Sequence, residues 1–449
     1  MQTRRFFAIC CIAGIIFTGE AKAAIESDSL KNDPVRSEAF SHWGMGLFIH
    51  WSLDSELGSV ISHTMVGASD DYLQRYLNEL PQFFNPTEYQ PEAWAKLAKL
   101  AGFKYMVLTT KHHSGFCLWP TQTTEFSINA TPYRKDIIGP YVKACRQYGL
   151  KVGFYFSPED FLFLHKQGHE IRRKSKYANI STNPELLAYN KKQIKELFTQ
   201  YGPIDLVFLD AFDNLAIRQY IHELQPACLV TRGEMETPEQ RVPNTPMPGP
   251  WEACFTLGTQ WQFKPTNEAY KSGTELIEML IDIRAKGGNL LINAGPEPSG
   301  RIPFEQERIL RELALWMFIN HEAIYDIRPC PIIKEQNIWF TRSSQNAQTV
   351  YLFIQQGKAL WQHGERKEFT LKSLIATDAL RVSVLGQNDR SVEYQPNIDP
   401  LSKAEQSDAG LKISVVRAQR IYNDRKWPNP IVVKLENVAF VAAISDDSK

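Results

Sequence analysis

The sequence has no excess of charge of either sign. Its 449 residues include 50 Lys plus Arg and 50 Asp plus Glu, so the formal net charge at pH 7 is zero. Proteins that bind nucleic acid or an anionic membrane surface through their overall charge carry a basic excess. The balance therefore predicts no nucleic-acid partner and no electrostatic membrane anchor.

Cysteine is scarce, and no metal-ligand spacing accompanies it. Beyond the first 23 residues the cysteines are Cys117, Cys145, Cys228, Cys254 and Cys330. They are scattered, odd in number and without a CxxC pair, which argues against a disulfide scaffold and a structural zinc site. We expect buried thiols.

Long apolar runs are missing except near the N-terminus. Arg4 and Arg5 precede an apolar stretch over residues 6–18, and Ala21-Lys22-Ala23 fits a small-x-small cleavage pattern. The stretch is too short to span a membrane. We predict a signal peptide over residues 1–23 and an exported protein, periplasmic or secreted.

Short apolar runs alternate with helical patterns from about residue 40 to 325, without an internal repeat. Continuous apolar runs predict strands over 46–51, 105–110, 152–157, 206–210, 228–232, 252–257 and 289–294. Helical spacing predicts helices over 91–101, 136–148, 184–201, 272–285 and 304–320. We therefore predict a (β/α)8-like barrel over residues 24–328, with some strands degenerate. A doubly wound open sheet is the alternative, although no G-x-G-x-x-G follows the first strand.

The pattern changes after about residue 326. Pro329 and Pro331 interrupt the helical periodicity, and alternating runs follow over 338–342, 349–355, 367–371, 382–385, 411–416 and 431–435. Short strands separated by polar turns are typical of a sandwich. We predict an antiparallel β-sandwich over residues 329–449.

Polar side chains stand where several predicted barrel strands end, which is where barrels place functional groups. His50, His112, His113 and Asp210 are among them. An acid that ends a buried apolar strand needs partners or a cleft. The structural alternative for Asp210 is the N-cap of a helix that begins near Asn214.

Carboxyl pairs are available for acid–base chemistry. Glu234, Glu236 and Glu252 follow Asp210 along the chain, and spacing does not choose between them. Glu252 follows Trp251, whose ring could desolvate it and raise its pKa, as a general acid requires. Aromatic residues make up 12% of the chain, a content that suits sugar stacking and an ordinary core equally.

Five blocks of the sequence resemble the α-L-fucosidases of glycoside hydrolase family 29, in the family's order. They are WGMGLFIHW at 43–51, AGFKYMVLTTKHHSGF at 101–116, VGFYFS at 152–157, GEMETPEQ at 233–240 and GGNLLINAGP at 287–296. The resemblance implies an imperfect barrel followed by a β-sandwich. It also implies a retaining exo-α-L-fucosidase that acts on fucosylated oligosaccharides or glycans by double displacement, without a metal or cofactor.

The resemblance assigns roles to individual residues. Asp210 takes the place of the nucleophile and Glu252 that of the acid/base, with Glu236 as the alternative. The expected substrate-binding residues are His50, Trp51, His112, His113, Tyr155 and Glu236.

Three departures from the family pattern bear on substrate choice. Ser114 replaces the Asp of H-H-D-G-F, Ala211-Phe212 follows the nucleophile position, and residues 59–63 lack a tryptophan. The departures keep open a related sugar such as α-L-galactose. Two separate alternatives are an inactive fucosyl-glycan-binding protein and a metal-dependent hydrolase that uses His112, His113 and a carboxylate.

Overall fold

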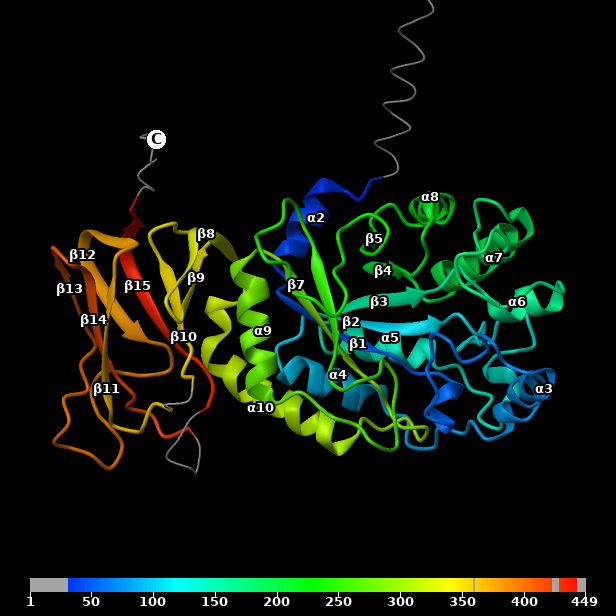
Figure 1. Cartoon of the computed structure of the whole chain (residues 1–449), viewed down its shortest axis with the longest axis horizontal. Coiled ribbons are helices and arrows are strands. Elements are labelled where there is room, and N and C mark those ends of the chain that lie inside the picture. Colours follow the sequence, from blue (N-terminus) through cyan, green and yellow to red (C-terminus); the bar gives the residue numbers. More distant parts are fainter. Residues whose placement is uncertain (1–30, 358–359, 422–427, 442–449) are drawn as a thin grey trace, which may run out of the picture.

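The computed structural model describes residues 31–357, 360–421 and 428–441. The predicted signal peptide lies outside these residues. Two parts follow one another along the chain: a barrel-like part, and a smaller part made of strands (Figure 1). Within the described residues, no helix is both long and apolar enough to cross a membrane.

Seven parallel strands form the sheet of the larger part, in the order β5-β4-β3-β2-β1-β7-β6. They are β1 (Met45–Ile49), β2 (Tyr105–Lys111), β3 (Lys151–Phe156), β4 (Leu206–Leu209), β5 (Leu229–Val230), β6 (Glu252–Thr256) and β7 (Asn289–Ala294). After β5, isolated bridges pair Glu236 with Trp251 and Glu239 with Cys254, so this segment runs beside β6. An irregular segment therefore accompanies β6 at the edge of an imperfect barrel, as predicted.

Helices cover the outside of this sheet (Figure 1). They are α2 (Pro34–Ser41), α3 (Asp70–Asn78), α4 (Pro91–Leu100), α5 (Ile138–Gln147), α6 (Phe161–Lys166), α7 (Pro184–Gln200), α8 (Leu215–Leu224), α9 (Gly273–Ala285) and α10 (Phe304–Asn320). Short 3-10 helices are η1 (Leu53–Glu56), η2 (Leu80–Gln82), η3 (Ile128–Ala130) and η4 (His321–Ala323). Local sequence fixes several starts: proline opens α4 and α7, and Ser272 with Glu275 forms a capping box on α9.

The barrel interior is filled by side chains that alternate inward along the strands. Phe48, Tyr105, Tyr155 and Phe208 belong to one buried cluster inside the sheet. Gly46 makes room for it, because an added Cβ would lie 2.3 Å from the Tyr105 ring. The interior is thus a packed core whose upper layer carries the polar residues described below.

The smaller part contains two antiparallel sheets. One has the order β12-β15-β10-β9-β8 and the other β11-β14-β13. The strands are β8 (Ile327–Glu335), β9 (Ile338–Ser343), β10 (Val350–Ile354), β11 (Arg366–Leu371), β12 (Leu374–Val384), β13 (Lys403–Ser407), β14 (Gly410–Val416) and β15 (Ile431–Phe440). Helices α9 and α10 lie against this part (Figure 1), and Trp316 of α10 donates to the Pro430 carbonyl at 2.8 Å.

Most predicted elements are found within one or two residues. The prediction missed β8, which begins at Ile327, and β13, which carries mostly exposed polar residues over Lys403–Ser407. It also found only the end of β12 and the first half of β15, and it gave no helix at α2, α3 or α6. Exposed strands lack the apolar alternation on which the assignment depends.

Candidate active site

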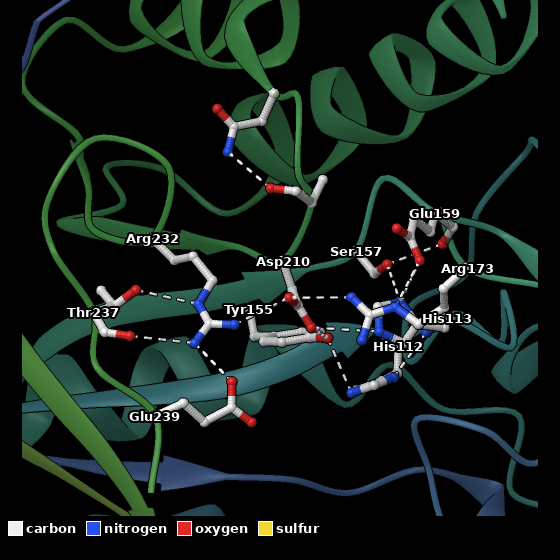
Figure 2. Close-up of polar contacts among 12 residues, drawn as sticks. His112, His113, Tyr155, Ser157, Glu159, Arg173, Asp210, Arg232, Thr237 and Glu239 are labelled. Carbon is white, nitrogen blue, oxygen red and sulfur yellow. Dashed lines mark hydrogen bonds and ion pairs between the residues drawn. The ribbon is translucent and has the colours of Figure 1, made fainter. Parts of the chain in front are cut away.

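Asp210 follows β4 and lies at the centre of a polar cluster at the carboxyl ends of the strands (Figure 2). Its side chain is 15% exposed. Tyr155 donates to Oδ2 at 2.7 Å, and His113 Nε2 lies 3.4 Å from the same oxygen. The guanidinium groups of Arg232 and Arg173 lie 3.3 and 3.7 Å from Oδ1. Asp210 therefore has cations or donors on both oxygens.

This environment keeps Asp210 ionised. Burial by itself raises the pKa of the carboxyl, but the opposing effects are larger: His113, then Arg232 and Arg173, hold the pKa well below its usual value. The alternative role as a helix cap is not observed. Helix α8 begins after Asn214, and the Asp210 carboxylate is occupied by the cluster.

A chain of hydrogen bonds fixes His112 and Tyr155. The backbone N–H of His113 donates to His112 Nδ1 at 2.9 Å, so the other ring nitrogen carries the proton. That nitrogen, Nε2, lies 2.9 Å from the Tyr155 hydroxyl, which in turn donates to Asp210. Burial holds the pKa of His112 well below its usual value. His112 is thus a neutral donor that orients the tyrosine.

His50 follows β1 and is held in a similar way. Its Nδ1 lies 2.6 Å from Asn293 Oδ1, and burial lowers the pKa of the imidazole to about 3. With Nδ1 donating to the amide oxygen, Nε2 is left as an acceptor. The half-buried Trp261 ring lies 4.9 Å from the His50 ring, between centroids. The His50 imidazole and the Trp261 ring therefore offer a polar and an apolar surface side by side.

A fully buried ion pair supports the histidines from behind. Lys111, which ends β2, donates to Asp160 Oδ2 and to Asn190 Oδ1, each at 3.1 Å. Asp160 also caps α6. Gly115 allows this approach, because a Cβ there would lie 2.5 Å from Asp160 Oδ1. The sequence Lys111-His112-His113 therefore joins a structural cation to two residues of the cluster.

Glu239 is an exposed carboxyl group that shares Arg232 with Asp210. Arg232 donates to Glu239 Oε2 at 2.8 Å and to Asp210 Oδ1 at 3.3 Å (Figure 2). One planar guanidinium between two carboxylates keeps the two oxygens within about 8 Å. The Glu239 side chain is 43% exposed, so substrate and solvent can reach it. Sequence reasoning did not weigh Glu239, although it ends the quoted T-P-E segment.

Comparison with known proteins agrees with this geometry. A family model described as Alpha-L-fucosidase matches residues 18–322. The chain belongs to the alpha-L-fucosidase family. It is 27% identical to the tissue alpha-L-fucosidase of Mus musculus over 353 residues, which cover 72% of this chain and 74% of the relative. The human tissue alpha-L-fucosidase is 27% identical over 404 residues, covering 80% and 83%.

A solved family member shares the fold. The alpha-L-fucosidase isoenzyme 1 from Paenibacillus thiaminolyticus superposes with a TM-score of 0.70 at 26% identity, covering 89% of this chain and 98% of the other. The predicted fold class and the predicted family are confirmed.

Glu252, the acid/base expected from the family resemblance, is placed elsewhere by the structure. It begins β6, at the amino end of the strands, and is fully buried. Its Oε2 accepts from Tyr105, which begins β2, at 2.7 Å. Cys254, two residues or about 7 Å nearer the mouth, lies between it and Arg232. Glu252 therefore lies at the closed end of the barrel, since it is the first residue of its strand, and its predicted role as acid/base stays a prediction.

Trp51 does not line the site either. It is fully buried, and its Nε1 donates to the Glu297 carbonyl at 3.0 Å. Its ring packs against Phe84, Tyr89 and Trp94, outside the sheet. The chain alternates, so His50 faces the mouth and Trp51 faces the surrounding helices.

The other two candidate glutamates lie apart from Asp210. Glu236 is exposed, and its carbonyl accepts from the backbone N–H of Glu252 at 3.2 Å. Glu234 accepts from the backbone of Asn32. Neither of these two glutamates shares a described contact with the nucleophile position, in contrast to Glu239.

His112, His113 and Asp210 also offer three ligand atoms within 4.8 Å of one another. This set is the only such group found among the described residues. His112 Nε2 and Asp210 Oδ2 are joined through the Tyr155 hydroxyl, which occupies the position between them. A cation at this point would have to displace that hydroxyl.

Proposed function

We propose that the protein is a retaining exo-α-L-fucosidase with Asp210 as nucleophile and Glu239 as acid/base. One observation carries the assignment. A carboxylate held ionised and a solvent-accessible carboxyl share Arg232 at the carboxyl ends of the barrel strands. Double displacement needs two carboxyl groups, one that attacks the anomeric carbon and one that exchanges a proton with the leaving oxygen and with water. Its substrates are fucosylated oligosaccharides or glycans, as the family membership supports.

In the first step, Asp210 Oδ2 or Oδ1 attacks the anomeric carbon of fucose. The bond to the aglycone oxygen breaks, and Glu239 gives its proton to that oxygen. In the second step, water attacks the anomeric carbon, its proton passes to Glu239, and the bond to Asp210 breaks. After the second step, Asp210 is again ionised and Glu239 again protonated, as they were when the cycle began.

Neighbouring residues bind and orient the sugar. Neutral His50 presents an acceptor, and His112 with Tyr155 holds the nucleophile in line. Trp261 stands beside His50 and offers an apolar surface that suits the C5 methyl group of fucose better than the hydroxymethyl group of galactose. Glu236 remains a predicted substrate-binding residue. We also propose that the protein is exported, on the strength of the N-terminal pattern.

Azide rescue tests both roles, because the product differs. With 4-nitrophenyl α-L-fucoside, Asp210→Gly should lose turnover, and azide should restore it as the inverted β-fucosyl azide. Glu239→Gly should yield the retained α-fucosyl azide. Glu236→Gly is the matched control and should show no azide effect. Turnover that survives in Asp210→Gly without azide, or α-azide formed by Glu236→Gly instead, would contradict the assignment.

Two further measurements separate the alternatives. A binding protein without activity would retain fucose affinity in the absence of turnover by the wild type. A metal-dependent hydrolase would lose activity in EDTA and recover it with a divalent cation. We expect activity to persist in EDTA, and 4-nitrophenyl α-L-galactoside to be a poorer substrate.

A further inference from the structure

Asp210 is bridged to a second glutamate that the proposed mechanism does not use. Arg173 donates from Nε to Glu159 Oε2 at 2.9 Å and lies 3.7 Å from Asp210 Oδ1 through Nη2 (Figure 2). This repeats the arrangement in which Arg232 joins Asp210 to Glu239. The nucleophile position therefore lies between two arginine–glutamate pairs.

The two pairs differ in exposure, and so they cannot serve the same purpose. The Glu159 side chain is 5% exposed, against 43% for Glu239. Glu159 also lies 4.0 Å from His113 Nδ1, and its backbone carbonyl accepts from Ser157 at 2.9 Å. A carboxylate fixed in this way, beneath Arg173, is poorly placed to exchange protons with water or with a leaving group.

Arg173 comes from outside the barrel strands, in the connection between α6 and α7. Its neighbour Lys174 has a left-handed backbone with φ 60°, which residues other than glycine rarely adopt. The Lys174 ammonium lies 4.6 Å from the centre of the Phe212 ring, and the Arg173 guanidinium lies 5.7 Å from it. Phe212 is the second residue after Asp210. Adjacent cations thus attach this connection to the nucleophile loop at two points.

We propose that Arg173 is a second electrostatic partner of the nucleophile and that Glu159 is the positioning residue that holds it there. This inference rests on the proposed function and adds two residues to it. A cation within about 4–6 Å favours the ionised carboxylate. Arg173 therefore keeps Asp210 charged before substrate binds, and Glu159 restricts the guanidinium to the orientation that reaches Oδ1.

The sign of a pH shift distinguishes positioning from simple charge. Glu159 is negative, so if it acted on Asp210 only through its charge, Glu159→Gln would move the acid limb of kcat/KM to lower pH. If it acts by holding Arg173, the same substitution releases the cation and moves the limb to higher pH. In an Arg173→Gln background only the direct charge effect is left, and the shift reverses.

The experiment is a double-mutant cycle read as pH profiles of kcat/KM on 4-nitrophenyl α-L-fucoside between pH 3 and 7. We expect Arg173→Gln to raise the apparent pKa of the acid limb by about one unit and Glu159→Gln to raise it by less. Arg173→Lys keeps a cation and should reverse part of the shift seen in Arg173→Gln. Arg172→Gln is the matched control: this exposed arginine pairs with Glu170 at 3.5 Å and should leave the profile unchanged. Thermal melts confirm that each variant is folded.

The outcomes separate this inference from the proposed function. If the wild type is active and Arg173→Gln leaves its pH profile unchanged, the role of Arg173 is refuted while the proposed function stands. If Glu159→Gln moves the acid limb of kcat/KM to lower pH, the role of Glu159 in positioning Arg173 is refuted. A wild type that hydrolyses no fucoside refutes the proposed function, and this inference with it.

Discussion

Replacing Glu252 by glutamine separates the structural assignment from the one that the sequence suggests. Loss of a general acid costs about 10²–10⁴-fold in rate. Glu252 is fully buried at the closed end of the barrel and bonded to Tyr105, so we expect kcat/KM in Glu252→Gln to fall less than about threefold. Glutamine keeps the shape and still accepts from the tyrosine hydroxyl.

The same substitution should change stability in a pH-dependent way. Burial raises the pKa of the Glu252 carboxyl above its unfolded value. The native state therefore favours the protonated form, and ionisation costs stability as the pH rises from about 4.3 through the native pKa. We expect the free energy of unfolding of Glu252→Gln to lie within about 1 kcal/mol of the wild-type value near pH 4 and to exceed that value towards pH 8.

The assay combines kinetics with calorimetry. Turnover of a fucosylated oligosaccharide, whose leaving group needs protonation, is measured beside the thermal midpoint at pH 4, 6 and 8. Glu239→Gln is the matched variant and should lose activity on this substrate while its melting curve changes little. A hundredfold loss in folded Glu252→Gln, with α-azide formed by Glu252→Gly, would refute the reasoning.

Two other predictions concern the scaffold. Asp160→Asn leaves Lys111 buried without its counter-ion and should cost about 3–5 kcal/mol of stability, measured as a lower thermal midpoint. The double variant Lys111→Met with Asp160→Asn should recover part of the lost stability. An unchanged midpoint in the single variant would contradict the account. Gly46→Ala places a Cβ 2.3 Å from the Tyr105 ring and should cost about 1–3 kcal/mol. An unchanged thermal midpoint in Gly46→Ala would contradict this account.

Sequence patterns predicted the candidate site in part. Asp210, His50, His112, His113 and Tyr155 all lie in one cluster, because each ends a parallel strand or faces inward near its end, and such ends converge at one mouth. The arginines were missed, since Arg232 is marked only by its position at the end of a predicted strand and Arg173 lies in an irregular connection. No periodicity marks a residue whose function depends on a contact made across the fold.

The amino-acid sequence by itself determined the order of most strands and helices, the family, and the place of Asp210 at the end of a buried strand. These follow from local periodicity and from motifs that are contiguous along the chain. Only the tertiary structure showed which glutamate shares Arg232 with Asp210. Glu252 and Glu239 lie 13 residues apart, yet one is sealed at the closed end of the barrel and the other meets Arg232 at its mouth. Depth inside a barrel depends on where each strand starts and on its register with its neighbours, and neither quantity is written in local sequence.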